Sequence, residues 1–136
     1  MRTKPCLTAK DVGRIVAACR EVAAAQSWAV TIVVTDDAGR PMHLERLDAR
    51  ASTVDVALGK ARTAALMCMP TADLEKRVLA VPTLMALDAM PLRGGLPLQV
   101  GADFVGAIGV SGVTAEQDEQ VAAAGVAMLA RIVAGA

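Results

Sequence analysis

The sequence predicts an α+β fold in which helices pack against an antiparallel sheet of about four to five strands. The prediction rests first on the order of elements along the chain: helix, two strands, helices, two strands, helix. It rests also on the short turns that join the strands in pairs, as in β-hairpins. The length of 136 residues and the apolar fraction of 54% suit one domain with a sizeable core, so we expect residues 1–136 to form a single domain.

The first predicted helix begins at a capping box formed by Thr8 and Asp11 and ends near Gln26. A run rich in Val, Ile and Thr follows at 28–35, then an Asp-Asp-Ala-Gly turn and a second extended run at 42–47. These two runs predict a β-hairpin. Within the helix, apolar residues recur at helical spacing, at Val12, Ile15, Val16, Cys19, Val22 and Ala23.

A second helix is predicted from a capping box of Ser52 and Asp55, and Pro70 ends it. A short third helix follows over 73–79, with Thr71 as its cap. Both helices begin at a hydroxyl side chain, which is the residue type that best satisfies the free N–H groups of a first helical turn.

The segment 81–90 contains proline and has no clean period, so we expect an irregular, mobile connection that could cover a site. Two further strands are predicted at 96–100 and 104–110, separated by a short hairpin loop. A last helix begins at a third capping box, formed by Thr114 and Gln117.

The charges and cysteines exclude several partners. Fourteen basic and fourteen acidic residues cancel, so we expect neither nucleic acid nor an anionic membrane as a partner. No apolar run is long enough to span a bilayer, and the N-terminus does not resemble a signal peptide. Cys6, Cys19 and Cys68 are far apart and lack metal-ligand spacing, which favours buried small hydrophobic residues in a reducing, cytoplasmic compartment.

Glycines near the C-terminal end suggest a site made of backbone amides. Ser111 and Gly112 stand between a buried strand and the last helix, where free N–H groups and the helix dipole could bind an anion or a carbonyl group. Equally, Gly112 could only make the turn. Gly106 and Gly109, inside the strand, are better explained by close packing of a helix on the sheet.

Arg93 precedes two glycines, Gly94 and Gly95. Their N–H groups could form a nest with a cation beside it, which would suit a carboxylate. The alternative is a flexible bend that Pro97 makes rigid again.

Side-chain alternation places Arg46 and Asp48 on one face if the strand stays extended, either as a polar pair at a pocket rim or as a surface salt bridge. Lys60 and Thr63 lie on one side of the second helix. Lys60 could bind an anion or, if desolvated, act as a base, although a solvated lysine is the commoner case. His43 is the only histidine, so any histidine ligand to iron must be this residue.

Five motifs in order resemble the GlcG/HbpS-like haem-binding family, which also forms the C-terminal domain of PduO-type proteins. The resemblance covers nearly the whole chain and implies a profilin/PAS-like sandwich, small-molecule binding and a homo-oligomer. Haem is the implied cofactor, but the first helix here has no histidine, which leaves His43, a methionine or a cysteine as its ligand. The motifs are Arg46-Leu47-Asp48, Lys60-Ala61-Arg62-Thr63-Ala64, Gly94-Gly95-Leu96-Pro97-Leu98, the strand Val105-Gly106-Ala107-Ile108-Gly109-Val110 with Ser111-Gly112, and Asp118 with Ala124-Gly125.

Three functions follow as hypotheses. The first is a small-molecule-binding protein, with haem as the candidate ligand. The second is a cofactor-free hydrolase, isomerase or tautomerase of a catabolic or biosynthetic pathway, acting on a small carboxylate or carbonyl compound. In that enzyme Lys60, Arg46 and the glycine amides would hold the anion, and Asp48 or Asp118 would move a proton. The third is an accessory protein whose main property is assembly through its Ala- and Gly-rich helices.

Overall fold

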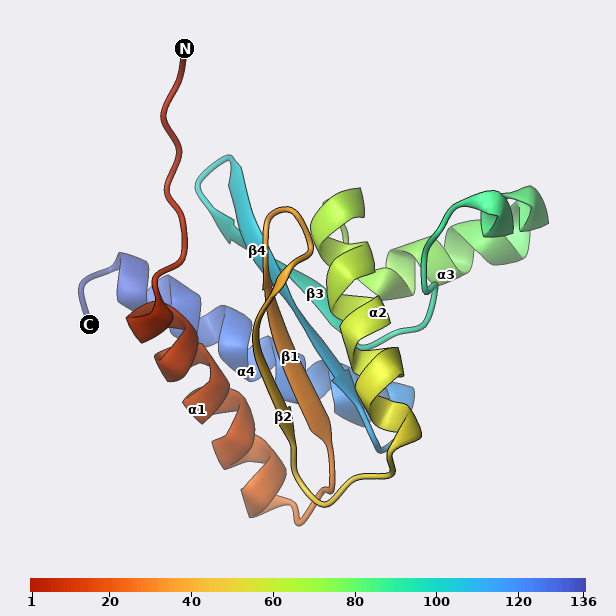
Figure 1. The fold of residues 1–136 in the computed structure, drawn as a ribbon, viewed down its shortest axis with the longest axis horizontal. Helices are drawn as coiled ribbons and strands as arrows, with labels where there is room; N and C mark the ends of the chain where they lie inside the picture. Colours follow the sequence, from red (N-terminus) through yellow and green to blue (C-terminus); the bar gives the residue numbers. More distant parts are fainter.

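The computed structural model describes residues 1–136 and contains the predicted four strands, all antiparallel, in the spatial order β2-β1-β4-β3. The sheet combines both hairpins, and β1 and β4 are its central strands (Figure 1). The elements in chain order are α1 (Ala9–Ala25), β1 (Thr31–Asp36), β2 (Pro41–Arg46), α2 (Ser52–Met67), α3 (Thr71–Ala80), the 3₁₀ helix η1 (Pro82–Ala86), β3 (Gly95–Val100), β4 (Asp103–Ser111) and α4 (Ala115–Val133).

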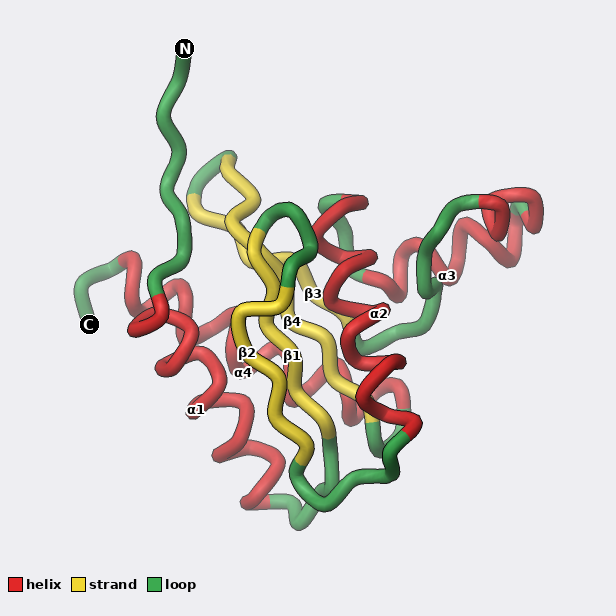
Figure 2. The backbone as a smooth tube through the Cα atoms, viewed as in Figure 1, coloured by secondary structure: helices red, strands yellow, loops and turns green.

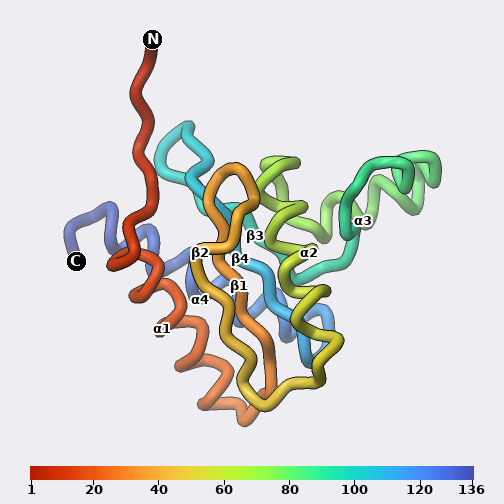
Figure 3. The backbone as a smooth tube through the Cα atoms, viewed as in Figure 1, coloured from red at the N-terminus to blue at the C-terminus, as the bar shows by residue number.

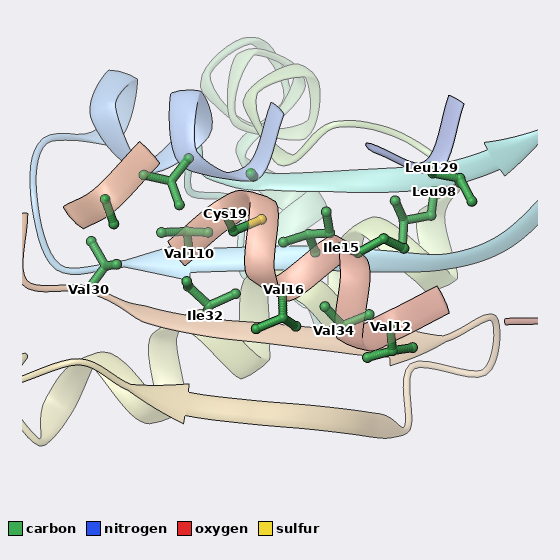
Figure 4. Close-up of a cluster of buried hydrophobic side chains, with 14 of the residues drawn as sticks. Val12, Ile15, Val16, Cys19, Val30, Ile32, Val34, Leu98, Val110 and Leu129 are labelled. Atoms are coloured by element: carbon green, nitrogen blue, oxygen red, sulfur yellow. The ribbon is translucent and has the colours of Figure 1, made fainter. Parts of the chain in front are cut away.

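The main core lies between the sheet and the pair α1 and α4. Alternate residues of the central strands, such as Ile32 and Val110, point to this side and are fully buried (Figure 4). Gly125 lets α4 approach closely, since a Cβ there would lie 2.8 Å from the Cys19 sulfur and 2.4 Å from Ile108 Cδ1. This core is built from Val, Ile, Leu and Ala together with Cys19, so its close packing depends on aliphatic and small residues rather than on aromatic rings.

The opposite face of the sheet is covered by α2 (Figure 2). Val33 packs there against Ala57 and Ala61, and all three are fully buried. A Cβ on Gly109 would lie 2.0 Å from the Ala57 carbonyl oxygen and 2.5 Å from the Ala61 nitrogen. The prediction that Gly109 permits close packing of a helix on the sheet is therefore confirmed.

The short helix α3 and η1 project from the body on the β3 side, where Figure 3 shows them extending away from the sheet. Only Thr71 and Leu74 of α3 are buried, and no residue of η1 is. The segment 81–90, expected to be irregular, thus contains the 3₁₀ helix Pro82–Ala86.

Two of the three predicted capping boxes are present, at Thr8 and at Thr114. The box predicted at Ser52 is wrong, because Ala51 is the N-cap and already has helical angles, which places Ser52 inside the first turn. The predicted cap of α3 is wrong as well. Pro70 is its N-cap, and the Thr71 hydroxyl instead accepts a hydrogen bond from the Gly95 amide at 2.8 Å.

No helix combines the length and the hydropathy that a membrane crossing requires. All three cysteines are free, but only Cys19 is buried, so the expectation of buried cysteines is wrong for Cys6 and Cys68. Burial raises the pKa of the Cys19 thiol to about 12.

Candidate functional site

The predicted residues Lys60 and Asp118 meet in the interior. Lys60 is 4% exposed and Asp118 is 3% exposed. The Lys60 Nζ donates to Asp118 Oδ2 at 3.1 Å and to the Val110 carbonyl oxygen at 2.9 Å. The expectation of a solvated lysine is therefore wrong, because the middle of α2 lies directly over the end of β4.

The other oxygen of the Asp118 carboxylate accepts a hydrogen bond from the segment just before α4. Its Oδ1 accepts from the Val113 amide at 3.0 Å. Burial raises the pKa of Asp118 above its usual 3.8, against the lowering by the Val113 hydrogen bond and by the nearby Lys60 charge. Of the two interpretations of the segment before α4, an anion site or a simple turn, the structure shows the Val113 amide bonded to a carboxylate of the chain itself.

The two glycines after Arg93 close over this pair. Gly94 has a φ of +124°, and a Cβ there would lie 2.9 Å from Lys60 Nζ and 2.8 Å from the Val110 carbonyl oxygen. Gly95 is held by Thr71, and a Cβ on it would lie 2.5 Å from the Lys60 carbonyl oxygen. Both glycines are buried. We call Lys60, Asp118, Gly94 and Gly95 the closed cluster.

Other predicted site residues lie around the closed cluster. Ser111 is 8% exposed and pairs with Thr31 in the sheet, whereas Gly112 is exposed and passes close to Ala29. Thr63 accepts from the Met90 amide at 2.8 Å and so fastens the returning loop to α2. Arg93 Nη2 donates to Glu119 Oε1 at 3.0 Å. None of the surface grooves is lined by Lys60 or Asp118.

Arg46 and Asp48 do not form the predicted pair. The strand β2 ends at Arg46, and Asp48 has a φ of +55°, so the alternation that would place both side chains on one face stops between them. Arg46 Nε donates to the Ala49 carbonyl oxygen at 2.8 Å, and neither residue forms an ion pair. Asp48 instead lines a groove at the end of α1.

His43 lies in an ordered polar group on the other side of the molecule. Its Nε2 is 3.2 Å from Glu45 Oε2, and the Glu45 carboxylate accepts two hydrogen bonds from Arg20, at 2.9 and 2.7 Å. The hydrogen bonds from Arg20, and to a smaller extent the contact with His43, hold the pKa of Glu45 below its usual 4.5. An ionised carboxylate only accepts, so it fixes the hydrogen of a neutral His43 on Nε2 and leaves the Nδ1 lone pair free.

A groove of about 430 Å³ lies next to this polar group, between the end of α1 and the residues after β2. Its floor is apolar, and Arg20 belongs both to the groove and to the Glu45 pair. The residues lining it are Arg20, Ala23, Ala24, Ser27, Trp28, Ala29, Leu47 and Asp48. We call His43, Glu45, Arg20 and this groove the α1–β2 face.

Of this face, only His43 and Asp48 were predicted from the sequence as site residues. Arg20 and Trp28 were missed, although a signal was present. His43, Glu45 and Leu47 share one face of the strand by alternation, and Arg20 is a lone cation one turn from the end of α1. What the pattern does not reveal is that α1 and β2 lie side by side in the same direction (Figure 1).

Comparisons with known proteins agree on one group. The family model "Haem degrading protein HbpS-like" matches residues 7–127. Protein GlcG of Escherichia coli strain K12 is 38% identical over 119 residues, covering 82% of this chain and 85% of GlcG.

Solved structures give the same result. A double mutant of HbpS from Streptomyces reticuli superposes with a TM-score of 0.88 and 32% identity, covering 95% of this chain and 90% of that chain. The haem complex of PduOC superposes with a TM-score of 0.85 and 25% identity, covering 91% of this chain and 95% of that chain.

Proposed function

The chain belongs to the HbpS-like family, and from this premise we propose that it is a small-molecule-binding protein whose ligand is haem. One structural relative of 0.85 TM-score was solved as a haem complex, which supports this choice of ligand. The observation that carries the proposal is the juxtaposition on the α1–β2 face. The single imidazole of the chain, oriented by Glu45, lies on the same face as a groove of about 430 Å³, and Arg20, which contacts Glu45, lines that groove.

The donor chemistry of this face fits haem. The free Nδ1 of His43 is the type of atom that ligates haem iron, and a carboxylate on the other ring nitrogen is the usual support for a metal-binding imidazole. Arg20 supplies a cation suited to an anionic substituent. When bound, haem would supply its iron centre to this face, and the protein's contribution is the ligand, the cation and the apolar floor.

The dimensions of the face favour a large ligand over a small acid. His43 and Leu47 are four residues apart on one extended segment, which corresponds to about 13 Å. A molecule that contacts both the imidazole and the groove floor must span that length. A porphyrin does so, whereas a small carboxylate does not. Trp28 adds the one aromatic ring of the groove.

The enzyme alternative rests on Lys60, Asp118 and the glycine amides, and the geometry gives it no support. Both charged groups are buried and already bonded to each other and to the backbone. The Gly95 amide donates to Thr71. A substrate has no groove through which to reach them.

The proposal includes a homo-oligomer in a cytoplasmic, reducing compartment. Three free cysteines support that compartment, because two of them are exposed and unpaired. Exposed large apolar side chains, among them Leu79 and Met85, support the assembly.

Titration of the purified protein with hemin tests the proposal. We expect a shifted and sharpened Soret band with saturation at one haem per chain, and the loss of that band shape in His43→Ala. Met42→Ala is the matched control, since Met42 is the neighbouring residue on the opposite face of β2 and carries a sulfur that could itself ligate iron.

The result that would overturn the proposal is an unchanged spectrum of free hemin with the parent protein. If His43→Ala retained the parent spectrum, the assignment of the α1–β2 face would be wrong even if haem bound. A blocked groove gives an independent readout. In Ala24→Trp, which fills the groove from an exposed position of α1, we expect weaker hemin binding with the same ligand spectrum.

A further inference from the structure

A groove of about 260 Å³ lies between the turn that joins β1 to β2 and the neighbouring part of α2. It contains two arginines, Arg40 from the turn and Arg62 from α2, and no carboxylate lines it. The groove of the α1–β2 face shares no residue with it. The lining residues are Ala38, Gly39, Arg40, Pro41, Leu58 and Arg62, and we call this groove the turn groove.

The backbone of the turn is held in place by Asp36. The Asp36 Oδ1 accepts hydrogen bonds from the amides of Ala38 and Arg40, both at 2.9 Å. Its backbone carbonyl oxygen accepts from the Gly39 amide at 3.1 Å, and its amide donates to the Arg40 carbonyl oxygen at 2.9 Å. The residue that carries the first cation of the groove therefore has a fixed backbone before a ligand binds, which lowers the entropy cost of binding.

The turn packs directly on the side chain of Arg62. Gly39 is buried with a φ of +74°, and a Cβ there would lie 2.9 Å from Arg62 Cγ. The contact holds the aliphatic part of Arg62 against the turn, whereas the side chain as a whole is 54% exposed. Two cations from different elements are thereby brought to one groove.

The two cations have little compensation within the chain. Arg40 forms no ion pair, and the single ion-pair partner of Arg62 is Asp88, with 3.7 Å between Nη2 and Oδ2. That distance exceeds a hydrogen bond, and the Asp88 side chain is 93% exposed, so the pair contributes little. Asp37, the other acid of the turn, is paired with Lys4. The N–H donors of both guanidinium groups are therefore available to an external anion.

We propose that the turn groove binds the phosphate group of a small organic phosphate. A guanidinium presents a planar fork of N–H donors that matches phosphate oxygens, and two such groups match the double charge of a phosphate ester. Leu58 and Pro41 supply an apolar wall for the organic part. The volume of about 260 Å³ lies just below the range typical of drug-sized ligands, so the ligand is small.

NMR titration of the purified protein tests the site, with phenyl phosphate and inorganic phosphate as probes at about pH 8, where a phosphate ester is a dianion. We expect saturable shifts of the backbone amides of Ala38, Gly39 and Arg40 and of the Arg62 Nε–H signal. Chloride at the same ionic strength should leave these signals in place, because screening alone does not fill a site for a dianion. Phenyl phosphate should bind more tightly than inorganic phosphate, since its ring contacts the apolar wall.

The variants Arg40→Gln and Arg62→Gln each remove one cation and keep a long polar side chain. Each should raise the dissociation constant for phenyl phosphate by about tenfold or more, with an unchanged unfolding transition because both side chains are exposed. Arg62→Lys keeps the charge but loses the fork, so it should weaken binding less than Arg62→Gln. The matched control is Arg77→Gln, an exposed arginine of α3 outside the turn groove, which should bind as the parent does.

Three outcomes overturn the proposal: no saturable shift with either phosphate, the same shifts with chloride alone, or a loss in Arg77→Gln as large as in Arg40→Gln. Equal affinities for the two probes would overturn the assignment of an organic phosphate. The proposal goes beyond the binding of haem, because the turn groove and the α1–β2 face have no residue in common. None of these outcomes bears on the hemin titration, so the two proposals fail separately.

Discussion

Two pairs of opposite charges in this molecule resemble each other chemically but differ in their surroundings. In the closed cluster Lys60 contacts Asp118 at 3.1 Å, with 5% and 4% of the side chains exposed. On the α1–β2 face Arg20 contacts Glu45 at 2.7 Å, with 46% and 23% exposed. The first pair has all its partners inside the chain, whereas the second borders a groove and orients a histidine. Burial thus separates an ion pair enclosed in the fold from one that is partly exposed to solvent.

The comparison also predicts which pair matters for stability. Two charges taken out of water depend on each other, and removal of one leaves the other uncompensated. Two charges near water lose little when separated.

Lys60→Met leaves the Asp118 carboxylate buried without its cation. We expect the free energy of unfolding to fall by about 3 to 5 kcal/mol, measured by urea denaturation. The double variant Lys60→Met with Asp118→Leu should recover part of the loss, because it leaves no isolated charge.

The matched change on the open face is Arg20→Met, for which we expect a loss of about 1 kcal/mol or less. Equal losses in Lys60→Met and Arg20→Met would show that burial does not distinguish the two pairs.

Gly109 tests how tightly α2 packs on the sheet, and Gly13, on α1, is the control. In Gly109→Ala the new Cβ would lie 2.0 Å from the Ala57 carbonyl oxygen, so α2 must move away from the sheet. We expect a loss of about 1 to 3 kcal/mol in the free energy of unfolding. In Gly13→Ala, on α1, no atom lies within 4 Å of the new Cβ.

Because alanine favours a helix over glycine, Gly13→Ala should stabilise the protein by about 0.5 to 1 kcal/mol. The sign of the two changes is the test. A stabilising Gly109→Ala would contradict the close contact between α2 and β4.

The open pair should show its contribution through pH. The pKa of Glu45 is lowered from 4.5 in the folded state, so its stabilising contribution is fully present above about pH 4.5 and is lost as the pH falls through the folded pKa. Glu45→Gln should therefore cost about 0.2 to 1 kcal/mol at neutral pH. The difference between the two proteins should vanish in acid, as measured by urea denaturation at a series of pH values. A difference that stays constant with pH would remove the ion pair as its cause.

The elements of the fold were predictable because their signals are local. Helical periodicity identified α1 and α4, and the capping boxes at Thr8 and Thr114 set where they begin. The failures at Ser52 and Thr71 have a common cause. Neither hydroxyl stands at the N-cap, which is Ala51 in α2 and Pro70 in α3, so neither caps its helix. The Thr71 hydroxyl instead accepts a hydrogen bond from the amide of Gly95, which is distant in sequence.

The candidate site was less predictable because it depends on contacts between distant segments. Sequence alone identified Lys60, Asp118 and Gly94 as polar or flexible residues of interest, but not that they lie against one another in the interior. The predicted pair of Arg46 and Asp48 does not form, because the positive φ of Asp48 breaks the alternation of side chains along the strand. Arg20 and Trp28 could be recognised as residues of one face only once α1 and β2 were seen to lie side by side.

The buried thiol of Cys19 gives the molecule an internal reporter. Cys6 and Cys68 are exposed, whereas Cys19 lies against Gly125 in the main core with a pKa raised to about 12. Thiolate is the reactive form, so a thiol reagent should label two cysteines quickly and the third only when α1 separates from α4. The rate at which Cys19 is labelled therefore measures how often the native protein opens, without any engineered probe.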